Sequence, residues 1–581
     1  MKDSTVIYKN IQTYSKNSKF KKFVYKLIFR PSALKPKQPV SKVPEKSVIT
    51  KKIDGKIIRN IIIETLDPIG FSVSDKEKQP RNSFERFGNR MHNKTKKFVI
   101  RKLLLVQENQ VCDSILLKES ERLIRSQRFI REVAITPIYF DRSNDSIDIK
   151  VRVLDSWTLV PDGSISSSKS KIKLTERNIF GFGHQLSGQL GNKFESGEHD
   201  YNFNYAILNI FNTYTRFDLD YEKEFNDDSK RRIGLNRPFY SVFAKNAGGA
   251  NFENTVTTEA VPVGDSLVDA FTKFEYQEYW YGRAFKVTDP KWSETKYINL
   301  VAAVSFNRKA YLDSPSSVLD PTNFFASEKN TIGYIGISRQ KYYQDSFLFN
   351  YNIIEDVPYG ENISFIFGHQ RKNYGSRFYS GITISQGKKY SFGYLSSFAE
   401  WGSFFNDGVT EQMAFKIGAN YFSPLMHIGN WRIRQFVKPT YIWGNNRDAS
   451  YKDQLRLNNY YGIQGFNSEI YGTQKWVLAL QTQSYMPGNW NGFRFSPYLN
   501  IAVGSLASKN ALFNSKLYSK FTVGVQINND YLVFNSFQFS FSYYPTIPFE
   551  GDNVFKTNSF SNTDLTIEDY VLGKPGYIRY E

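Results

Sequence analysis

The chain has 581 residues, enough for two or three domains or for one large barrel with an appendage. Its net charge is +20 and its mean hydropathy is −0.47, yet 16% of its residues are aromatic. It contains no window of about 18 apolar residues, which excludes a membrane-spanning helix. Cys112 is the only cysteine, which excludes a disulfide framework within the chain. Such aromatic enrichment is typical of membrane β-barrels and also of secreted sugar-binding β proteins.

A basic extension is predicted at the N-terminus, over residues 1–54. Residues 1–50 contain twelve Lys or Arg and two acidic residues, and four prolines between positions 31 and 44 favour an extended linker. A segment of this charge could contact nucleic acid, anionic lipid or an acidic partner. The simpler expectation, which we adopt, is a solvated linker.

A compact α+β domain is predicted over residues 55–155. Ile57–Ile63 is a β-branched run that predicts a strand, and the turn Asp67–Gly70 ends it. A helix-compatible stretch extends through Phe98–Leu105. A second helix is expected after Asp113, because Asp is a good N-cap and the apolar residues that follow are spaced for one helical face.

Two strands are predicted to complete this domain. The first includes Val133, Ile135 and Phe140. In the second, the apolar residues from Ile147 to Val153 alternate with charged ones, the period-two pattern of a strand with one buried face. The predicted order is therefore strand, helix, helix, strand, strand.

From about Trp157 onward, helical periodicity gives way to repeated alternation of apolar and polar residues between Gly, Asn and Asp turns. Clear examples are residues 217–222, 521–527 and 537–543. A β-sandwich alternates in the same way, but this signal continues to the C-terminus, longer than one sandwich needs. A closed barrel also removes exposed sheet edges. We predict a mainly β protein in which residues 156–581 form a closed transmembrane antiparallel barrel of about sixteen strands.

Four short segments share their order and spacing with one protein family. They are Val99–Leu104, Glu119–Arg125, Val151–Leu159 and Glu176–Gly183. The first three resemble the polypeptide-transport-associated (POTRA) domain of the BamA/TamA-type surface-antigen superfamily, in its Bacteroidetes-like form, and the fourth resembles that family's early barrel segment. The resemblance extends from about residue 55 to the end. Where the family often has Gly-Asp between its helices this chain has Asn109-Gln110, and Asn tolerates the left-handed backbone of such a turn.

A loop after the polar stretch 445–459 resembles the family's inward-folded sixth extracellular loop. Its tip consists of Gly462, Ile463, Gln464, Gly465 and Phe466. Five strands are expected after it, as in a sixteen-strand member of the family. Their expected ranges are 475–486, 493–504, 519–528, 535–544 and 564–573.

This loop departs from the family at its central residue. The resemblance implies an Arg at the tip, paired with an Asp in the thirteenth strand, but these positions hold Gln464 and Ala502. Removing one member of a buried ion pair leaves the other charge without a partner, which costs about 3–5 kcal/mol. Losing both members avoids this cost. By alternation, the lumen positions of that strand are Asn500, Ala502 and Gly504. We expect Gln464 to hold the loop through neutral hydrogen bonds.

A weak barrel seam is predicted where the first and last strands meet. The first strand would include Trp157 and Leu159, and the last would include Tyr570 and Leu572 and end at Gly573. Gly573, Pro575 and Gly576 weaken strand pairing there, because Pro lacks a ladder donor. A weak seam would let the barrel open sideways. Alternatively, residues 573–581 are a tail beyond the last strand.

No catalytic or metal-binding grouping is visible, and the five histidines are scattered, so we expect a non-enzyme without cofactor or metal. The resemblance implies assembly or translocation of outer-membrane proteins. The expected partners are client outer-membrane or secreted polypeptides, the bilayer with its lipopolysaccharide, and other assembly subunits, with no nucleic acid. Alternatives are a dedicated polypeptide or lipid export pore, a non-catalytic barrel subunit, and a soluble β-sandwich binder.

The expected location is the bacterial outer membrane, with the small domain in the periplasm. An exported protein requires a signal peptide, and the apolar stretches near the start of this chain are too short and too basic for one. We therefore expect the sequence to be that of a mature form.

Overall fold

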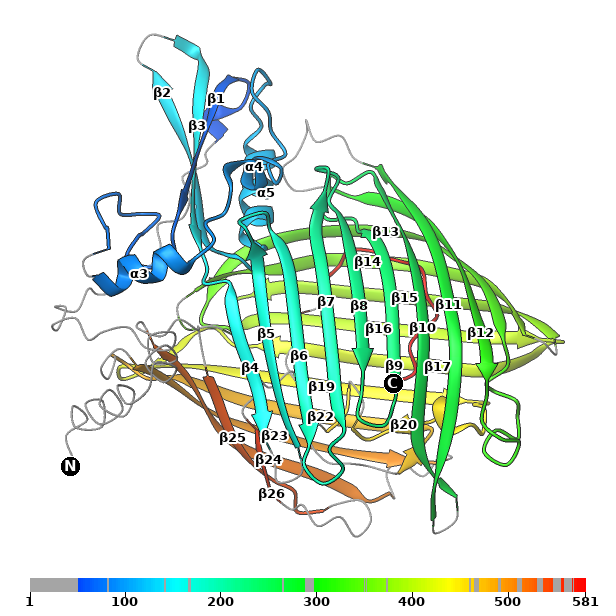
Figure 1. Ribbon diagram of the computed structural model, residues 1–581. Coiled ribbons are helices and arrows are strands. Elements are labelled where there is room, and N and C mark those ends of the chain that lie inside the picture. The colour runs from blue at the N-terminus through cyan, green and yellow to red at the C-terminus, as the bar shows by residue number, and fades with distance from the viewer. Residues whose placement is uncertain are drawn as a thin grey trace, which may run out of the picture.

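A computed structural model shows a small domain set against one end of a large curved sheet (Figure 1). It describes residues 51–80, 83–140, 143–165, 169–263, 266–287, 297–349, 351, 353–372, 375–458, 461–463, 470–488, 493–508, 515–529, 537–546, 555–558, 567 and 569–581. The basic stretch 1–50 and the loop-tip residues Gln464, Gly465 and Phe466 lie outside this part of the chain. Within the described residues, none of the helices combines the length and the apolar character needed to cross a membrane.

The small domain has the predicted order of elements, with one additional helix. Its elements are η1 (Lys51–Ile53), β1 (Ile57–Leu66), α3 (Ser83–Met91), α4 (Lys97–Arg101), α5 (Ser114–Arg125), β2 (Ile130–Phe140) and β3 (Ser143–Asp155). The sheet order is β1-β3-β2, with β3 parallel to β1 and antiparallel to β2. Strand β2 therefore lies at a sheet edge.

Local signals in the sequence account for the start of α5 and for the turn before it. The Asp113 side chain accepts a hydrogen bond from the Ile115 amide at 2.8 Å, as expected of an N-cap. Asn109 has a φ of 65°, which confirms the left-handed turn predicted there. One boundary changes: Ile53 is buried in the domain core and Asp54 accepts from the Ser114 amide, so residues 51–54 pack with the domain.

The large sheet runs around a ring in chain order, and the last strand, β26, lies beside the first, β4. We call this ring the barrel. Its first half consists of β4 (Leu159–Ile165), β5 (Lys169–Ile179), β6 (His184–Lys193), β7 (His199–Ile210), β8 (Thr215–Lys223), β9 (Ser229–Arg237), β10 (Asn246–Val263), β11 (Ser266–Lys286), β12 (Asn299–Asp313) and β13 (Glu328–Ser346). Its second half consists of β14 (Ile354–Lys372), β15 (Gly375–Tyr390), β16 (Gly393–Asn406), β17 (Val409–Phe422), β18 (Met426–Ile428), β19 (Trp431–Asn445), β22 (Gln474–Tyr485), β23 (Phe493–Ala507), β24 (Leu517–Asn529), β25 (Phe537–Tyr543) and β26 (Phe555–Asn558).

The prediction of about sixteen strands was too low. Among the residues that the structure describes, the ring contains 21 segments, and β17 and β18 act as one strand because both pair with β19. The connections between the strands from β4 to β9 are short, so this part of the chain contains more strands than the prediction allowed. The long loop 446–473 contains η3 (Tyr451–Asp453) and a small sheet of β20 (Leu455–Arg456) and β21 (Tyr471–Gly472). Of the five strands predicted after it, the first four match β22 to β25. The fifth prediction, 564–573, is wrong in the residues that the structure describes, and the fifth strand seen among them is β26.

The barrel turns its apolar side chains outward. In β12, Val304 is 49% exposed while the adjacent Ser305 is 1% exposed. In β24, Val523 is 63% exposed and Thr522 is 4% exposed. This alternation follows from the period of two along a strand, and it confirms the strand predictions for 217–222, 521–527 and 537–543.

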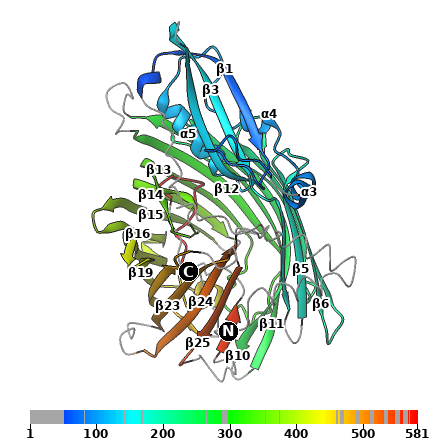
Figure 2. The same ribbon diagram turned by 90° about the vertical axis from the view of Figure 1, so that its left-hand side faces the viewer.

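The inward face is less uniformly polar than expected. Ser, Asn, Gln and Lys side chains occupy many inward positions, but aromatic residues gather there around the C-terminal segment and the long loop. Figure 2 shows the domain at one end of the barrel, with β23, β24 and β25 side by side. We call the end of the barrel next to the domain the mouth. We call the space inside the ring the lumen.

Candidate functional site at the mouth, lumen and seam

Helix α5 of the domain docks on the barrel mouth through two arginines. Both carboxylate oxygens of Asp356, in β14, accept from Arg125 Nη1 at 2.7 Å. The Arg122 guanidinium donates to the Tyr240 carbonyl at 3.1 Å and lies 4.2 Å from the centre of the Tyr342 ring. Burial would lower the pKa of Arg122, but its ion pair with Glu119 raises that pKa above the ordinary value. Charged contacts thus hold the domain against the lumen entrance.

The turn between β5 and β6 forms a second joint between domain and barrel. The Asn178 side chain donates to Thr95 Oγ1 at 2.9 Å and accepts from the Gly183 amide at 2.6 Å. The Lys96 amide donates to the Gly181 carbonyl at 3.0 Å. Gly181 has a φ of +78°, and a Cβ atom there would overlap the Lys94 carbonyl. The segment Glu176–Gly183, noted for its resemblance to the family, therefore places a tight turn against the domain.

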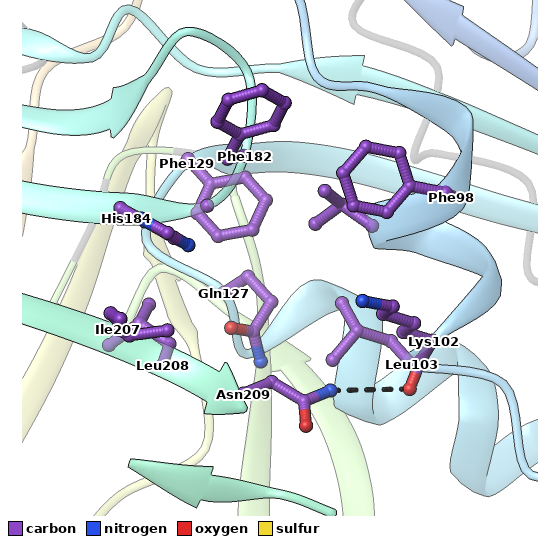
Figure 3. A pocket seen from close by; sticks show the side chains of 12 residues that line it. Phe98, Lys102, Leu103, Gln127, Phe129, Phe182, His184, Ile207, Leu208 and Asn209 are labelled. Atoms are coloured by element: carbon purple, nitrogen blue, oxygen red, sulfur yellow. Dashed lines mark hydrogen bonds between the residues drawn. The ribbon is translucent and has the colours of Figure 1, made fainter. Parts of the chain in front are cut away.

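A cavity of about 100 Å³ remains between the two parts, as Figure 3 shows. Its walls come from α4 and the region after α5 on one side, and from the β5–β6 turn and the end of β7 on the other. Phe98 and Phe182 meet across it, with ring centres 5.9 Å apart. Asn209 Nδ2 donates to the Lys102 carbonyl at 3.3 Å (Figure 3). Residual space at this joint makes its packing looser than that of a protein core.

The described residues of the long loop pack against the inward face of the barrel wall. Ile463, one of the predicted tip residues, is buried in the same apolar cluster as Ala502 of β23. Leu455 and Leu457 of the loop belong to this cluster, and the Ile463 amide donates to the Leu457 carbonyl at 2.8 Å. Ala502 thus lies in an apolar cluster with residues of the loop. The predicted hydrogen bonding of Gln464 falls outside the described residues.

The three predicted lumen positions of β23 do face inward. Asn500 and Ala502 are buried, whereas Leu499, at an outward position of the same strand, is exposed. Asn500 Nδ2 donates to Gln481 Oε1 at 3.3 Å, and its Oδ1 has no hydrogen-bond partner among the described residues. Gly504 lies where a Cβ atom would come within 2.5 Å of the Trp476 carbonyl oxygen. Close approach of β22 explains this glycine.

The seam prediction is right for Leu159, but Trp157 lies before the first strand and the prediction is wrong for the last strand. Leu159 begins β4 and pairs with Glu176, and the Trp157 indole donates to the Leu159 carbonyl at 2.7 Å. Tyr570, Leu572 and Gly573 are not in a strand; Tyr570 and Leu572 are buried against the lumen wall. Gly573, Pro575 and Gly576 oppose strand pairing, which is why the alternative of a tail after the last strand was the better prediction.

The seam strands are much shorter than those of the opposite wall. Strand β4 has 7 residues, β25 has 7 and β26 has 4, whereas β11 has 21 and β13 and β14 have 19 each. Ladder hydrogen bonds increase with strand length, so separating β26 from β4 breaks fewer of them than separating any two wall strands.

Charged side chains of the lumen pair with one another. Asp218 accepts from Arg216, and Asp220 accepts from Asn204 Nδ2 at 2.6 Å and from Arg232 Nε at 2.8 Å. Both carboxylates therefore have charged partners on the inward face. In the described part of the chain, no group of three or more His, Cys, Asp or Glu could hold a metal ion.

No family model matches this chain, and no curated protein matches it. Solved structures of similar shape include BamA from Haemophilus ducreyi lacking POTRA domains 1–3, with 10% identity, a TM-score of 0.33, and coverage of 87% of this chain and 83% of that chain. They also include CdiB from Acinetobacter baumannii (10% identity, TM-score 0.36, 96% and 98% covered) and CdiB from Escherichia coli (10% identity, TM-score 0.42, 95% and 97% covered). All three TM-scores are below 0.5, so the function of this chain does not follow from them.

Several residues of this site carry no recognisable sequence signal. Arg125 and Asp356 are 231 positions apart in the chain, and nothing in either local sequence marks them as partners. Tyr577 and Tyr580 follow two glycines and a proline, a pattern that predicts a turn. Their repeated aromatic character was the one signal that could have indicated burial.

Proposed function

We propose that this protein is an outer-membrane assembly factor that engages client polypeptides through its small domain and admits them at a laterally opening barrel seam. In this proposal residues 51–155 are a POTRA-like domain in the periplasm. Residues 156–581 are a closed transmembrane barrel, and residues 1–50 are a basic linker. The observation that carries the proposal is the shortness of β4 and β26, the strands that meet at the seam, compared with the far longer strands of the opposite wall.

The outward apolar face supports insertion in a bilayer. Exposed Val, Ile, Leu and Phe on β12, β13, β14, β24 and β25 alternate with buried polar residues. In hydrocarbon, each backbone polar group needs an internal partner, which a ring of strands supplies. The exposed apolar residues would be costly in water but suit lipid.

The edge of the domain sheet supports engagement of clients. Strand β2 is at the edge of the order β1-β3-β2, and an extended client segment can add to such an edge by β-augmentation. The domain is docked at the mouth by α5, so a client bound at β2 would be held near the lumen entrance.

Locking the seam tests this proposal. Cysteine pairs introduced between residues 159–165 and 555–558 should form disulfides and abolish client assembly in cells or in proteoliposomes. A matched pair at Ile337 and Ile363, which are register neighbours in β13 and β14, should form a disulfide without loss of activity. Full client assembly with the oxidised seam would contradict lateral opening.

A non-catalytic barrel subunit is the second candidate, because the loop and the C-terminal segment occupy the lumen. This candidate predicts low conductance in planar bilayers and no effect of the seam disulfide. An assembly factor predicts that the disulfide abolishes its activity.

A further inference from the structure

The C-terminal segment, residues 569–581, crosses the lumen from the mouth to the long loop. At the mouth, the Tyr570 amide donates to Gln340 Oε1 at 2.6 Å. At the far end, the Tyr580 hydroxyl donates at 2.7 Å to the carbonyl of Thr473, the residue before β22. The segment, red in Figure 1, forms neither helix nor strand and lies within the ring.

Wall side chains contact the backbone of this segment. Besides the Gln340 contact, Ser338 Oγ donates to the Tyr570 carbonyl and the Tyr334 hydroxyl donates to the Gly573 carbonyl, both at 2.7 Å. The three wall residues occupy alternate inward positions of β13. Because they bond to peptide groups, which every residue has, the same row can hold an extended chain of another sequence.

Glycines of the wall make room for the segment's side chains. A Cβ atom on Gly387 would overlap the Tyr570 hydroxyl, and one on Gly444 would overlap the Tyr580 ring. A Cβ atom on Gly336 would come within 2.7 Å of Leu572 and one on Gly402 within 3.0 Å of Ile578, but each would meet atoms of the wall at a shorter distance. These glycines lie in β13, β15, β16 and β19. Glycine often marks close approach of another chain, so Gly387 and Gly444, whose nearest neighbours belong to the segment, indicate a built groove.

Aromatic pockets complete the groove. The Tyr577 ring lies 4.5 Å from the ring of Tyr379 and 4.8 Å from that of Phe404, and its hydroxyl donates to Asn330 Oδ1 at 3.0 Å. The Arg447 guanidinium lies 3.9 Å from the centre of the Tyr580 ring.

We propose that this groove is a binding site for extended, tyrosine-bearing polypeptide segments, and that residues 569–581 are its resident occupant, which a client segment replaces. The client part of this inference rests on the proposed function. The occupant shares no ladder with the wall, so it can leave without unpairing a strand. Its entry point is also next to the domain, because the Tyr342 ring lies under Arg122 of α5 and its hydroxyl contacts Gln340.

Peptide binding in trans tests the groove. The probe is a fluorescent peptide with the sequence of residues 569–581, and binding is measured by anisotropy on the full-length protein in detergent. In a loosened variant, Tyr570→Ser, Tyr577→Ser and Tyr580→Ser weaken the resident segment and leave the wall intact. A tethered competitor acts at high effective concentration, so this variant should bind the peptide at least about ten-fold more tightly than wild type.

Two controls establish where the peptide binds. Adding Gly444→Val to the loosened variant should return its affinity to the wild-type level, because the new side chain occupies the place of the Tyr580 ring. A peptide with all three tyrosines replaced by serine should not bind. Equal affinity of wild-type and loosened proteins, with both barrels heat-modifiable, would overturn the proposal.

A second measurement keeps the native segment in place. Arg579 is 82% side-chain exposed, so a nitroxide on Arg579→Cys should leave the groove undisturbed. Millimolar unlabelled peptide should raise the mobility of the nitroxide, and unchanged mobility would show that the segment is a fixed part of the wall. Neither assay requires a client or a moving seam, so their failure would leave the seam experiment to be judged separately.

Discussion

The small domain and the barrel enclose two different interiors. The domain core consists mainly of aliphatic side chains contributed by residues 53–153. The barrel surrounds a lumen whose inward positions are largely polar and whose centre is filled by the loop and the C-terminal segment of the same chain. The domain is therefore stabilised mainly by hydrophobic burial, and the barrel by ladder hydrogen bonds and by what occupies it.

The two interiors should therefore differ in how well they tolerate a newly introduced polar or charged side chain. In the domain core any new charge lacks a partner, whereas most of the lumen offers partners to a charged side chain. The apolar cluster around Ile463 and Ala502 is a part of the lumen wall that resembles the domain core. The predictions below start from the strongest expected contrast.

Cys112 should be almost unreactive while the domain is folded. It is 2% exposed, and burial, with the nearby charges of Asp54 and Asp113, raises its pKa to about 12. At pH 8 the thiolate population falls about a thousand-fold relative to an ordinary cysteine, and alkylation should slow at least as much. Pulse alkylation followed by mass spectrometry, with and without urea, measures this. Rapid labelling in native buffer would show that the domain core opens.

Ala502→Asp should destabilise the loop and the barrel. The carboxylate would enter the apolar cluster with Ile463, but its register partner in β24 is the buried Lys520, so the cost should be below the about 3–5 kcal/mol of an unpaired buried charge. Adding Gln464→Arg should recover part of the loss by restoring the ion pair that the family resemblance implies. Heat-modifiability and protease protection of the loop 446–473 report the effect, and Ala502→Ser is the uncharged control. An unchanged melting temperature for Ala502→Asp would mean that water reaches this cluster.

Arg125→Ala should weaken the docking of the domain on the mouth. It removes charged hydrogen bonds to Asp356, each typically about 1.5–3 kcal/mol. A double-mutant cycle with Asp356→Asn, read by a distance label between domain and barrel, measures the coupling. Arg131→Ala is the control, because its pair with Glu132 spans 3.9 Å at an exposed site and should contribute almost nothing. Zero coupling between Arg125 and Asp356 would show that other contacts hold the domain.

Acid should remove a small part of the domain's stability. The hydrogen bond from Arg59 lowers the pKa of Asp148 below its ordinary value. The contribution of this pair is therefore present at neutral pH and is lost as the pH falls through the lowered pKa of folded Asp148. The urea midpoint of unfolding should fall less between pH 7 and pH 3 in Asp148→Asn than in the wild type. The effect should be the smallest of the four, because the Arg59 side chain is 53% exposed.

Much of the fold could be predicted because its causes are local. Alternation with a period of two identified the strands of 217–222 and 537–543, and the same period requires one face outward and one inward. Asp113 marked the start of α5, and Asn109 adopts the left-handed backbone that its residue type favours.

The site depended on contacts between distant parts of the chain. The groove for the C-terminal segment combines glycines of β15 and β19, and no local pattern shows that the two face one path. A run of alternating residues also does not reveal where a long segment divides into two short strands, so the strand count was too low.

The sequence by itself determined the order of elements in the domain and the inward and outward faces of the barrel strands, because both depend on neighbours within a few residues. Only the tertiary structure decided that α5 docks at the mouth, that β26 is the last strand, and that residues 569–581 occupy the lumen. Each of these depends on which surfaces meet after the ring has formed. Glycine and proline near the C-terminus oppose a strand, but they do not specify what the chain binds instead.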